Sequence, residues 1–257
     1  MTYFKSLLLA GCAVLIGSTS VAQAETSPLA AKGKLPFSED QRAAMEDFVR
    51  NFILDNPEVL MESVNRYRAS EQKKQEEGAV SVLKQNMSFL SNGKHPQIGN
   101  PKGDITVVEF FDYNCGYCKH ALKSVQELTD KDKNVKVIFM EFPILSPTSA
   151  TASKWAVAAN MQGKYWAFHQ AALESTAPKD DANLAKIAQS VGMDVEKARK
   201  DAEGKEVEAY MKSVREFGDK LKITGTPAFI VGQEIVRGYV EYPAFQTIVD
   251  DERKKSK

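Results

Sequence analysis

The chain of 257 residues has only three cysteines, too few for a disulfide-stapled scaffold or for a zinc site made of four thiolates. It also has no excess charge of either sign, because 34 Lys and Arg residues balance 34 Asp and Glu residues. This balance removes the electrostatic argument for binding nucleic acid, so we expect no nucleic-acid partner. Beyond the N-terminus, no apolar run approaches the roughly 18 residues that a membrane-spanning helix needs. The composition, 43% hydrophobic and 26% charged residues, is that of a globular protein.

The first 24 residues have the pattern of a signal peptide. Lys5 precedes a short apolar stretch at residues 7–16, and small residues at the end of the segment predict cleavage after Ala24. Cleavage there would remove Cys12 and deliver a protein with two cysteines to the periplasm, an oxidising compartment. A second interpretation stays open: residues 9–12 resemble a bacterial lipobox, in which Cys12 would be lipidated and would attach the protein to the envelope.

Residues 38–92 predict a charge-rich helical segment that follows a flexible lead-in at residues 25–37. Ser38 begins a capping box, S-x-x-Q, and apolar residues then recur at helical spacing, with Gly78 as a weak point. The apolar stripes are too narrow to build a core alone. They would either pair with a second copy of the chain, in a homodimer or homotrimer formed through residues 38–91, or pack against the rest of the chain. The end of the segment carries a seam of four apolar residues: Val80, Leu83, Met87 and Leu90.

After a polar linker at residues 95–103, the chain predicts a strand–helix–strand unit. Its strands are two β-branched and aromatic runs, residues 105–111 and 135–142, and the helix between them spans residues 115–129. Two such strands joined by one helix should be parallel. The rest of the chain predicts three or four helices between residues 149 and about 221, two strands at 227–231 and 234–237 joined by a Gly232-Gln233 hairpin, and a final helix at 242–251.

The motif Cys115-Gly116-Tyr117-Cys118 stands at the start of the first of these helices. A zinc site would need two more ligands, and the three histidines have no suitable spacing. Haem attachment needs a histidine directly after the second cysteine, but Lys119 stands there. A purely structural disulfide that closes only two intervening residues would restrict the unfolded chain little. Redox catalysis is the interpretation that the position favours, and we expect neither a metal nor a cofactor.

The position of the motif predicts different roles for the two catalytic thiols. Unpaired N–H groups and the helix dipole favour an anion at a helix N-terminus, so Cys115 should have a lowered pKa and act as the nucleophile. Cys118 lies one turn further along and should be the more buried, resolving thiol. Gly116 and Tyr117 lie between them and would tune the redox potential.

The segment VVEFFDYNCGYCK, residues 107–119, resembles the active-site segment of DsbA-like thiol-disulfide oxidoreductases of the thioredoxin superfamily. The resemblance covers about residues 100–255. It implies an α/β thioredoxin fold with an inserted helical subdomain at about residues 149–215, within a catalytic domain of residues 100–257. The helical segment described above would precede this domain as an oligomerisation segment.

Three residues outside the motif take roles from this resemblance. Thr226-Pro227 stands where the superfamily places a cis-proline beside the active disulfide, so both residues should bind substrate backbone as an added strand. Glu109 matches the buried acid that the family has near the resolving cysteine. An acid inside an apolar strand is costly without a partner or a proton role; the alternative for Glu109 is a salt-bridged residue at the edge of the sheet.

The direction of the reaction is the open question within the family. The N-terminal helical segment, the Gly-Tyr dipeptide and the Thr before the proline resemble DsbC-type isomerases and ScsC-like proteins more than monomeric DsbA-type oxidases. The resemblance implies a disulfide isomerase, or a dual isomerase and oxidase, that acts on unfolded or misoxidised exported proteins and has a membrane redox partner. A disulfide-donating oxidase is the alternative. A copper(I)-binding or otherwise non-catalytic envelope protein is a different class.

Overall fold

A computed structural model describes residues 37–255, and these fall into two units: the first ends at Ser63 and the second begins at Val64. The expected signal peptide, its cleavage after Ala24 and the lipidation of Cys12 lie outside the described residues. None of the helices within residues 37–255 is both long enough and apolar enough to cross a membrane.

The first unit contains α1 (Glu39–Asp55) and the beginning of α2 (Pro57–Gln85). The predicted capping box is confirmed: the Ser38 hydroxyl accepts a hydrogen bond from the Gln41 N–H, and the Gln41 side chain accepts one from the Ser38 N–H. No residue of α1 is buried. The exposed apolar side chains of this unit include Met45, Phe48, Val49, Phe52, Ile53, Leu54, Val59, Leu60 and Met61.

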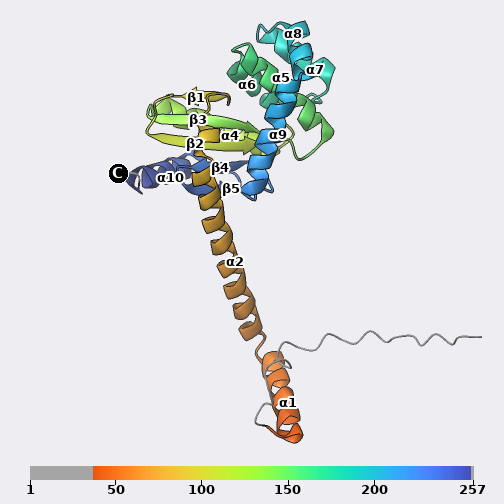
Figure 1. The fold of residues 1–257 in the computed structure, drawn as a ribbon, viewed down its shortest axis with the longest axis vertical. Coiled ribbons are helices and arrows are strands. Elements are labelled where there is room, and N and C mark those ends of the chain that lie inside the picture. The colour runs from red at the N-terminus through yellow and green to blue at the C-terminus, as the bar shows by residue number, and fades with distance from the viewer. Residues whose placement is uncertain (1–36, 256–257) are drawn as a thin grey trace, which may run out of the picture. The chain divides into compact units, whose positions relative to one another are not determined.

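The second unit contains a five-stranded sheet with the strand order β1-β3-β2-β4-β5 (Figure 1). β2 and β3 run parallel, as the strand–helix–strand pattern predicts, and the other neighbouring strands run antiparallel. The strands are β1 (Gln97–Gly99), β2 (Ile105–Phe111), β3 (Val135–Glu141), β4 (Ala228–Val231) and β5 (Glu234–Arg237). Because β2 lies between β3 and β4, nearly all of its side chains are buried.

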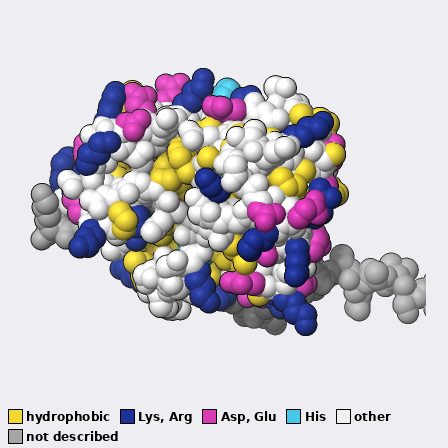
Figure 2. Space-filling view, turned by 90° about the horizontal axis from the view of Figure 1, so that it is seen from above, with side chains coloured by type: hydrophobic (Ala, Val, Ile, Leu, Met, Phe, Trp, Pro, Cys, Tyr) yellow, Lys and Arg dark blue, Asp and Glu magenta, His cyan; other side chains and the backbone are white. Residues whose placement is uncertain are grey.

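Helices cover both faces of this sheet. α4 and α10 contribute to the core on one face, and the end of α2 and α9 contribute to the core on the other. α5, α6, α7 and α8 pack together as one group (Figure 1). Besides the end of α2, the helices of the second unit are α3 (Met87–Leu90), α4 (Gly116–Lys131), α5 (Pro147–Met161), α6 (Tyr165–Glu174), α7 (Asp181–Ser190), α8 (Val195–Ala202), α9 (Lys205–Lys220) and α10 (Tyr242–Lys255). Basic and acidic side chains are interspersed on the face shown in Figure 2.

The structure differs from the sequence-based prediction in three local features. α2 continues through Gly78, because one glycine costs a helix only about 1 kcal/mol. β1 lies in the expected linker, where three residues without a hydrophobic alternation pair with β3. Five helices, α5 to α9, stand where three or four are predicted, since glycines at positive φ such as Gly163 and Gly192 separate short helices.

Two of the four residues in the apolar seam, Leu83 and Leu90, pack inside the second unit, whereas Met87 is exposed. Leu83 and Leu90 are 1% and 6% exposed, and together with Ala79 they join a core cluster with Phe110 and Phe217. The prediction that the seam pairs with a second copy of the chain is therefore wrong for these two leucines. The two leucines instead pack against the rest of the chain, where they cover one face of the sheet.

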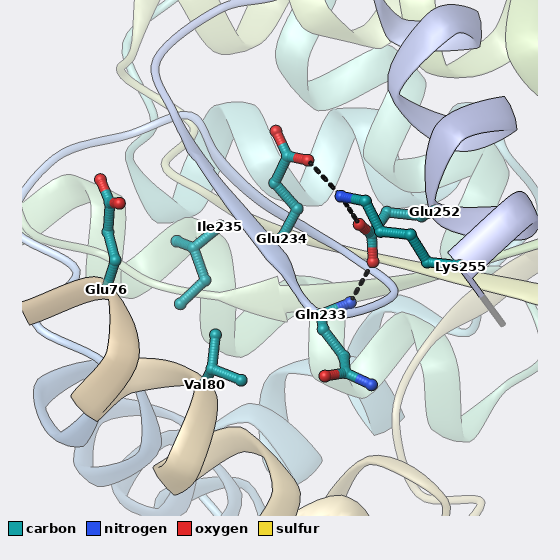
Figure 3. Close-up of a pocket in the computed structure, with 7 residues that line it drawn as sticks. All are labelled: Glu76, Val80, Gln233, Glu234, Ile235, Glu252 and Lys255. Atoms are coloured by element: carbon teal, nitrogen blue, oxygen red, sulfur yellow. Dashed lines mark hydrogen bonds and ion pairs between the residues drawn. The ribbon is translucent and has the colours of Figure 1, made fainter. Parts of the chain in front are cut away.

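The β4–β5 hairpin is held against α10. Gly232 adopts a positive φ of 58° in the predicted two-residue turn, which glycine allows without strain. The next N–H, that of Gln233, donates a hydrogen bond to the Glu252 carboxylate at 2.8 Å, and Lys255 bonds the same carboxylate at 2.6 Å. Figure 3 shows these residues beside a cavity of about 520 Å³ that also contacts α2 through Val80. This cavity contains none of the predicted site residues.

Candidate active site

Cys115 is the N-cap residue of α4, directly after the loop that follows β2. Its sulfur accepts a hydrogen bond from the Cys118 N–H at 3.3 Å, and its own N–H donates to the Asp112 carbonyl oxygen at 3.0 Å. Both cysteines are free thiols in this structure. Cys115 keeps 8% of its surface exposed, whereas Cys118 is fully buried. Only the first thiol is therefore open to a substrate.

The two thiols differ in the ease with which they lose a proton. Hydrogen bonding by Cys118 outweighs the effect of burial and lowers the pKa of Cys115 to about 6. Burial, supported by the bond to Cys115, raises the pKa of Cys118 far above its ordinary value. At neutral pH the site therefore combines a thiolate at Cys115 with a thiol at Cys118, which is the arrangement that a nucleophile and a resolving cysteine require.

Alkylation of the reduced protein tests this charge state. Because the thiolate is the reactive form, the rate of iodoacetamide modification should rise with pH to a midpoint near 6 and stay level above it. Replacing Cys118 by alanine should move the midpoint to higher pH, since the hydrogen bond from the Cys118 side chain provides the largest contribution to the lowered pKa. A wild-type midpoint near 8.5, the value of an unperturbed thiol, would contradict the assignment.

The Thr226–Pro227 peptide bond is cis and leads directly into β4. The Cys115 thiol donates to the Thr226 carbonyl oxygen at 3.2 Å, so this loop and the helix N-terminus face each other. A cavity of about 170 Å³ adjoins the loop and is lined in part by Arg237 and Gly238. The structure thus places the predicted substrate-binding pair beside the predicted nucleophile.

The two residues between the cysteines face outward. Tyr117 is 65% exposed, and its ring stacks on Tyr239 with a centroid distance of 6.4 Å. His120 contacts the same two rings edge-on at 6.1 and 5.9 Å. Gly116 has open space where a Cβ atom would stand. An exposed aromatic group therefore borders the reactive thiol.

Glu109 is buried in the middle of β2. It is 1% exposed, and neither carboxyl oxygen has a hydrogen-bond partner within residues 37–255. Burial raises its pKa to about 8, and the negative charges of Cys115 and Glu141 add to this effect. The charge of Glu109 in turn contributes to the raised pKa of Cys118. The alternative, an edge residue with a salt bridge, is wrong because β2 is a central strand.

Two buried acids near the site, Asp112 and Glu141, are not among the site residues predicted from the sequence. Asp112 is fully buried, and its carboxylate accepts hydrogen bonds from the N–H groups of Asn114, Ile144 and Leu145 at 2.7, 2.8 and 3.0 Å. It ties the loop that carries Cys115 to the loop after β3. The second acid is Glu141, at the end of β3 and 1% exposed. An acid that follows or ends a buried strand is the signal that could have identified both.

Removal of the Asp112 carboxylate should destabilise the catalytic unit. Asp112→Ala leaves three backbone N–H groups without an acceptor, and we expect a loss of about 3 to 5 kcal/mol in the free energy of unfolding, measured with urea on the reduced protein. Asp112→Asn keeps one acceptor oxygen and should lose less. Asp130→Ala, an exposed acid on α4, is the matched control. Equal stability of the two alanine variants would show that this carboxylate does not brace the loops.

Comparison with known proteins gives two family matches. The model of the DSBA-like thioredoxin domain matches residues 106–250, more than half of the chain, and the model of the copper resistance protein ScsC N-terminal domain matches residues 41–74. Among curated proteins, the Na(+)/H(+) antiporter NhaA 1 of Salinispora arenicola is 27% identical over 135 residues, which are 52% of this chain and 21% of the relative. The chain spans about a fifth of the length of the curated relatives it matches.

Solved structures cover more of the chain. A thioredoxin-like oxidoreductase from Silicibacter pomeroyi DSS-3 is 43% identical with a TM-score of 0.63, over 65% of this chain and 97% of that chain. The thiol-disulfide exchange protein alpha-DsbA2 from Wolbachia pipientis is 26% identical with a TM-score of 0.65, over 69% and 97%. ScsC from Proteus mirabilis, in a transitional conformation, is 26% identical with a TM-score of 0.63, over 86% and 98%.

These matches agree with the fold of residues 106–250 and with the helical segment that precedes it in the sequence. The α/β thioredoxin fold predicted from the sequence is confirmed. The chain belongs to the DSBA-like thioredoxin domain family, and its N-terminal helical segment matches the ScsC N-terminal domain.

Proposed function

We propose that this protein is a disulfide isomerase, or a dual isomerase and oxidase, for exported proteins in the periplasm, with Cys115 and Cys118 as its catalytic thiols. One observation carries the proposal: a solvent-accessible thiolate caps α4 directly above a fully buried thiol that keeps its proton. This arrangement gives one sulfur that attacks and a second that reacts only afterwards.

The proposed reaction consists of two successive thiol-disulfide exchanges. The Cys115 thiolate attacks one sulfur of a wrong substrate disulfide; a mixed disulfide forms, the substrate S–S bond breaks, and the other substrate sulfur leaves as a thiolate. That thiolate can attack another disulfide of the substrate and release Cys115 unchanged, which is isomerisation. Otherwise Cys118 attacks the Cys115 sulfur, which leaves the substrate reduced and the enzyme oxidised.

The neighbouring residues support these steps. Thr226 and Pro227 would align substrate backbone beside Cys115 as an added strand, because the loop lies 3.2 Å from the sulfur. Glu109, a nearby buried acid with no hydrogen-bond partner among residues 37–255, would accept the proton that Cys118 must lose in the resolving step. Gly116 and Tyr117 would tune the redox potential from the first turn of the helix.

The helical segment supports an oligomer. Its exposed apolar side chains lie in α1 and at the beginning of α2, and an isolated helix with such a surface gains stability by covering it. We propose that the helical segment of residues 38–92 forms a homodimer or homotrimer before the catalytic domain of residues 100–257, with the pairing confined to α1 and to the part of α2 before Ala79. The signal peptide would direct export and be cleaved after Ala24, and a membrane protein would supply or remove electrons.

Refolding of scrambled ribonuclease and reduction of insulin test the proposal, with Cys115→Ser as the control. Wild-type protein should perform both reactions, and the variant should perform neither. Unchanged activity in the variant would contradict an enzyme and favour an envelope protein without turnover. Trapping of the thiols in intact cells decides the direction: mostly reduced Cys115 and Cys118 indicate an isomerase, and a mostly oxidised pair indicates the alternative, a disulfide-donating oxidase.

A further inference from the structure

A group of buried polar side chains surrounds Glu141, and the reaction proposed above does not use it. The Glu141 Oε1 atom accepts hydrogen bonds from the hydroxyl groups of Tyr165 at 2.8 Å and Tyr113 at 3.4 Å. The Tyr113 hydroxyl also lies 3.1 Å from the Nδ1 atom of His169. Within the described part of the chain, Glu141 Oε2 has no hydrogen-bond partner. A carboxyl group is thus held between two tyrosines in the interior.

Glu141 and Glu109 share one face of the sheet. Glu141 stands opposite Phe111 in the parallel pairing of β2 with β3. Glu109 precedes Phe111 by two residues on β2, and strand residues two apart point to the same side. Two acids on adjacent strands therefore face the same buried layer. The pKa of each is raised to about 8, mainly by burial, and the charge of Glu141 contributes to the raised pKa of Glu109.

Within residues 37–255, the groups that face Glu141 include no cation. Tyr113 and Tyr165 donate hydrogen bonds to this carboxyl group. Its charged neighbours are the acids Glu109 and Asp112, and burial lowers the pKa of His169 to about 3, so that this ring is uncharged. Two buried carboxylates without a cation repel each other strongly. The titratable and polar groups that face Glu141 from the packed elements are Glu109 on β2, Asp112 and Tyr113 after β2, Ser153 on α5, Tyr165 and His169 on α6, and Tyr210 on α9.

The hydrogen bonds distinguish the two acids. Glu141 receives two hydroxyl donors that stabilise its ionised form, whereas Glu109 receives none within residues 37–255. A single negative charge in this layer therefore lies preferentially on Glu141. We propose that Glu141 is a positioning residue for the resolving step, and that its buried charge controls the pH at which Glu109 accepts the proton of Cys118. This inference rests on the proposed function of the two cysteines.

A reagent with two equal leaving groups separates the steps. The Cys115 thiolate attacks the disulfide of 5,5′-dithiobis(2-nitrobenzoate), its S–S bond breaks, and one coloured thiolate leaves. Cys118 then gives up its proton and attacks the Cys115 sulfur, the mixed S–S bond breaks, and a second coloured thiolate leaves. The rate of the first release reports Cys115 and the rate of the second reports the resolving step, each as a function of pH.

Glu141→Gln should shift the midpoint of the second release by about one pH unit to lower pH, because loss of the like charge lets Glu109 ionise earlier. The first release should keep its midpoint near 6. Tyr165→Phe removes a donor that favours the Glu141 carboxylate, so it should shift the second midpoint in the same direction by less. Glu127→Gln, on the exposed side of α4, is the matched control and should change neither profile.

The outcomes separate this inference from the proposed function. A second profile that stays in place or moves to higher pH in both Glu141→Gln and Tyr165→Phe would overturn the role of Glu141. If Glu141→Gln fails to fold, the Tyr165→Phe shift alone decides. Absence of a fast second release in the wild type would instead overturn Cys118 as the resolving thiol, and the proposed function with it.

Discussion

Cys118→Ser is expected to convert the protein into a covalent trap, whereas Cys115→Ser is expected to abolish its chemistry. Without Cys115 no accessible thiolate remains, and the rate of disulfide exchange should fall at least ~10³-fold, as when other nucleophiles are removed. Without Cys118 the first attack still occurs, because several other hydrogen bonds hold the Cys115 sulfur, but the mixed disulfide has no internal exit. Substrate proteins should therefore remain attached through Cys115.

Non-reducing gels of periplasmic extracts measure this difference. The Cys118→Ser variant should show slowly migrating bands that a reductant removes, and Cys115→Ser and the double variant should show none. The wild type is the reference for background adducts. Adducts of equal intensity in Cys115→Ser would mean that Cys118, although fully buried, is the attacking thiol, and the assignment of roles would be reversed.

The length of an N-terminal truncation is expected to decide whether the remaining protein stays stably folded. Removal of residues 25–63 ends at the boundary between the two units and should leave a folded monomer that keeps a Cys115 midpoint near 6. This monomer should lose isomerase activity and be oxidised more readily by a membrane partner. Removal of residues 25–91 also deletes Ala79, Leu83 and Leu90 from the core. We expect that loss to cost about 5 kcal/mol in the free energy of unfolding, a large part of the stability of a domain.

Light scattering and urea unfolding on both truncations test these expectations, with the mature full-length protein as the reference. A monomeric full-length protein would contradict oligomerisation through the helical segment. Equal unfolding free energies for the two truncations would show that the end of α2 contributes nothing to the core, and the packing described for Leu83 would then have no energetic weight.

Features with a local cause were predictable from the sequence. The run at residues 105–111 has the β-branched and aromatic composition of a central strand, and the structure has β2 there. The capping box at Ser38 depends on two residues in contact, and it formed as predicted. The position of Cys115 as a helix cap likewise follows from the end of a strand and the start of a helix.

Features that depend on a distant partner were not predictable in this way. A narrow apolar stripe such as that around Leu83 fits a second copy and a sheet face equally well, so only the fold shows that Phe110 and Phe217 cover it. β1 has no apolar alternation and exists because β3 offers an edge. Glu141 gains its significance from Tyr165, which the sequence places 24 residues away.

The buried end of α2 determines from which end this helix forms and from which end it frays. Starting a helix is unfavourable and extending one is not, so Ala79 and Leu83, fixed by the core, provide a ready nucleus from which the helix grows toward Pro57. Along the exposed stretch, pairs such as Lys74 with Glu71, at 2.7 Å, contribute only a few tenths of a kcal/mol each. Fraying therefore begins at Pro57 and advances toward the sheet, and local opening never has to disturb the turns beside Leu83.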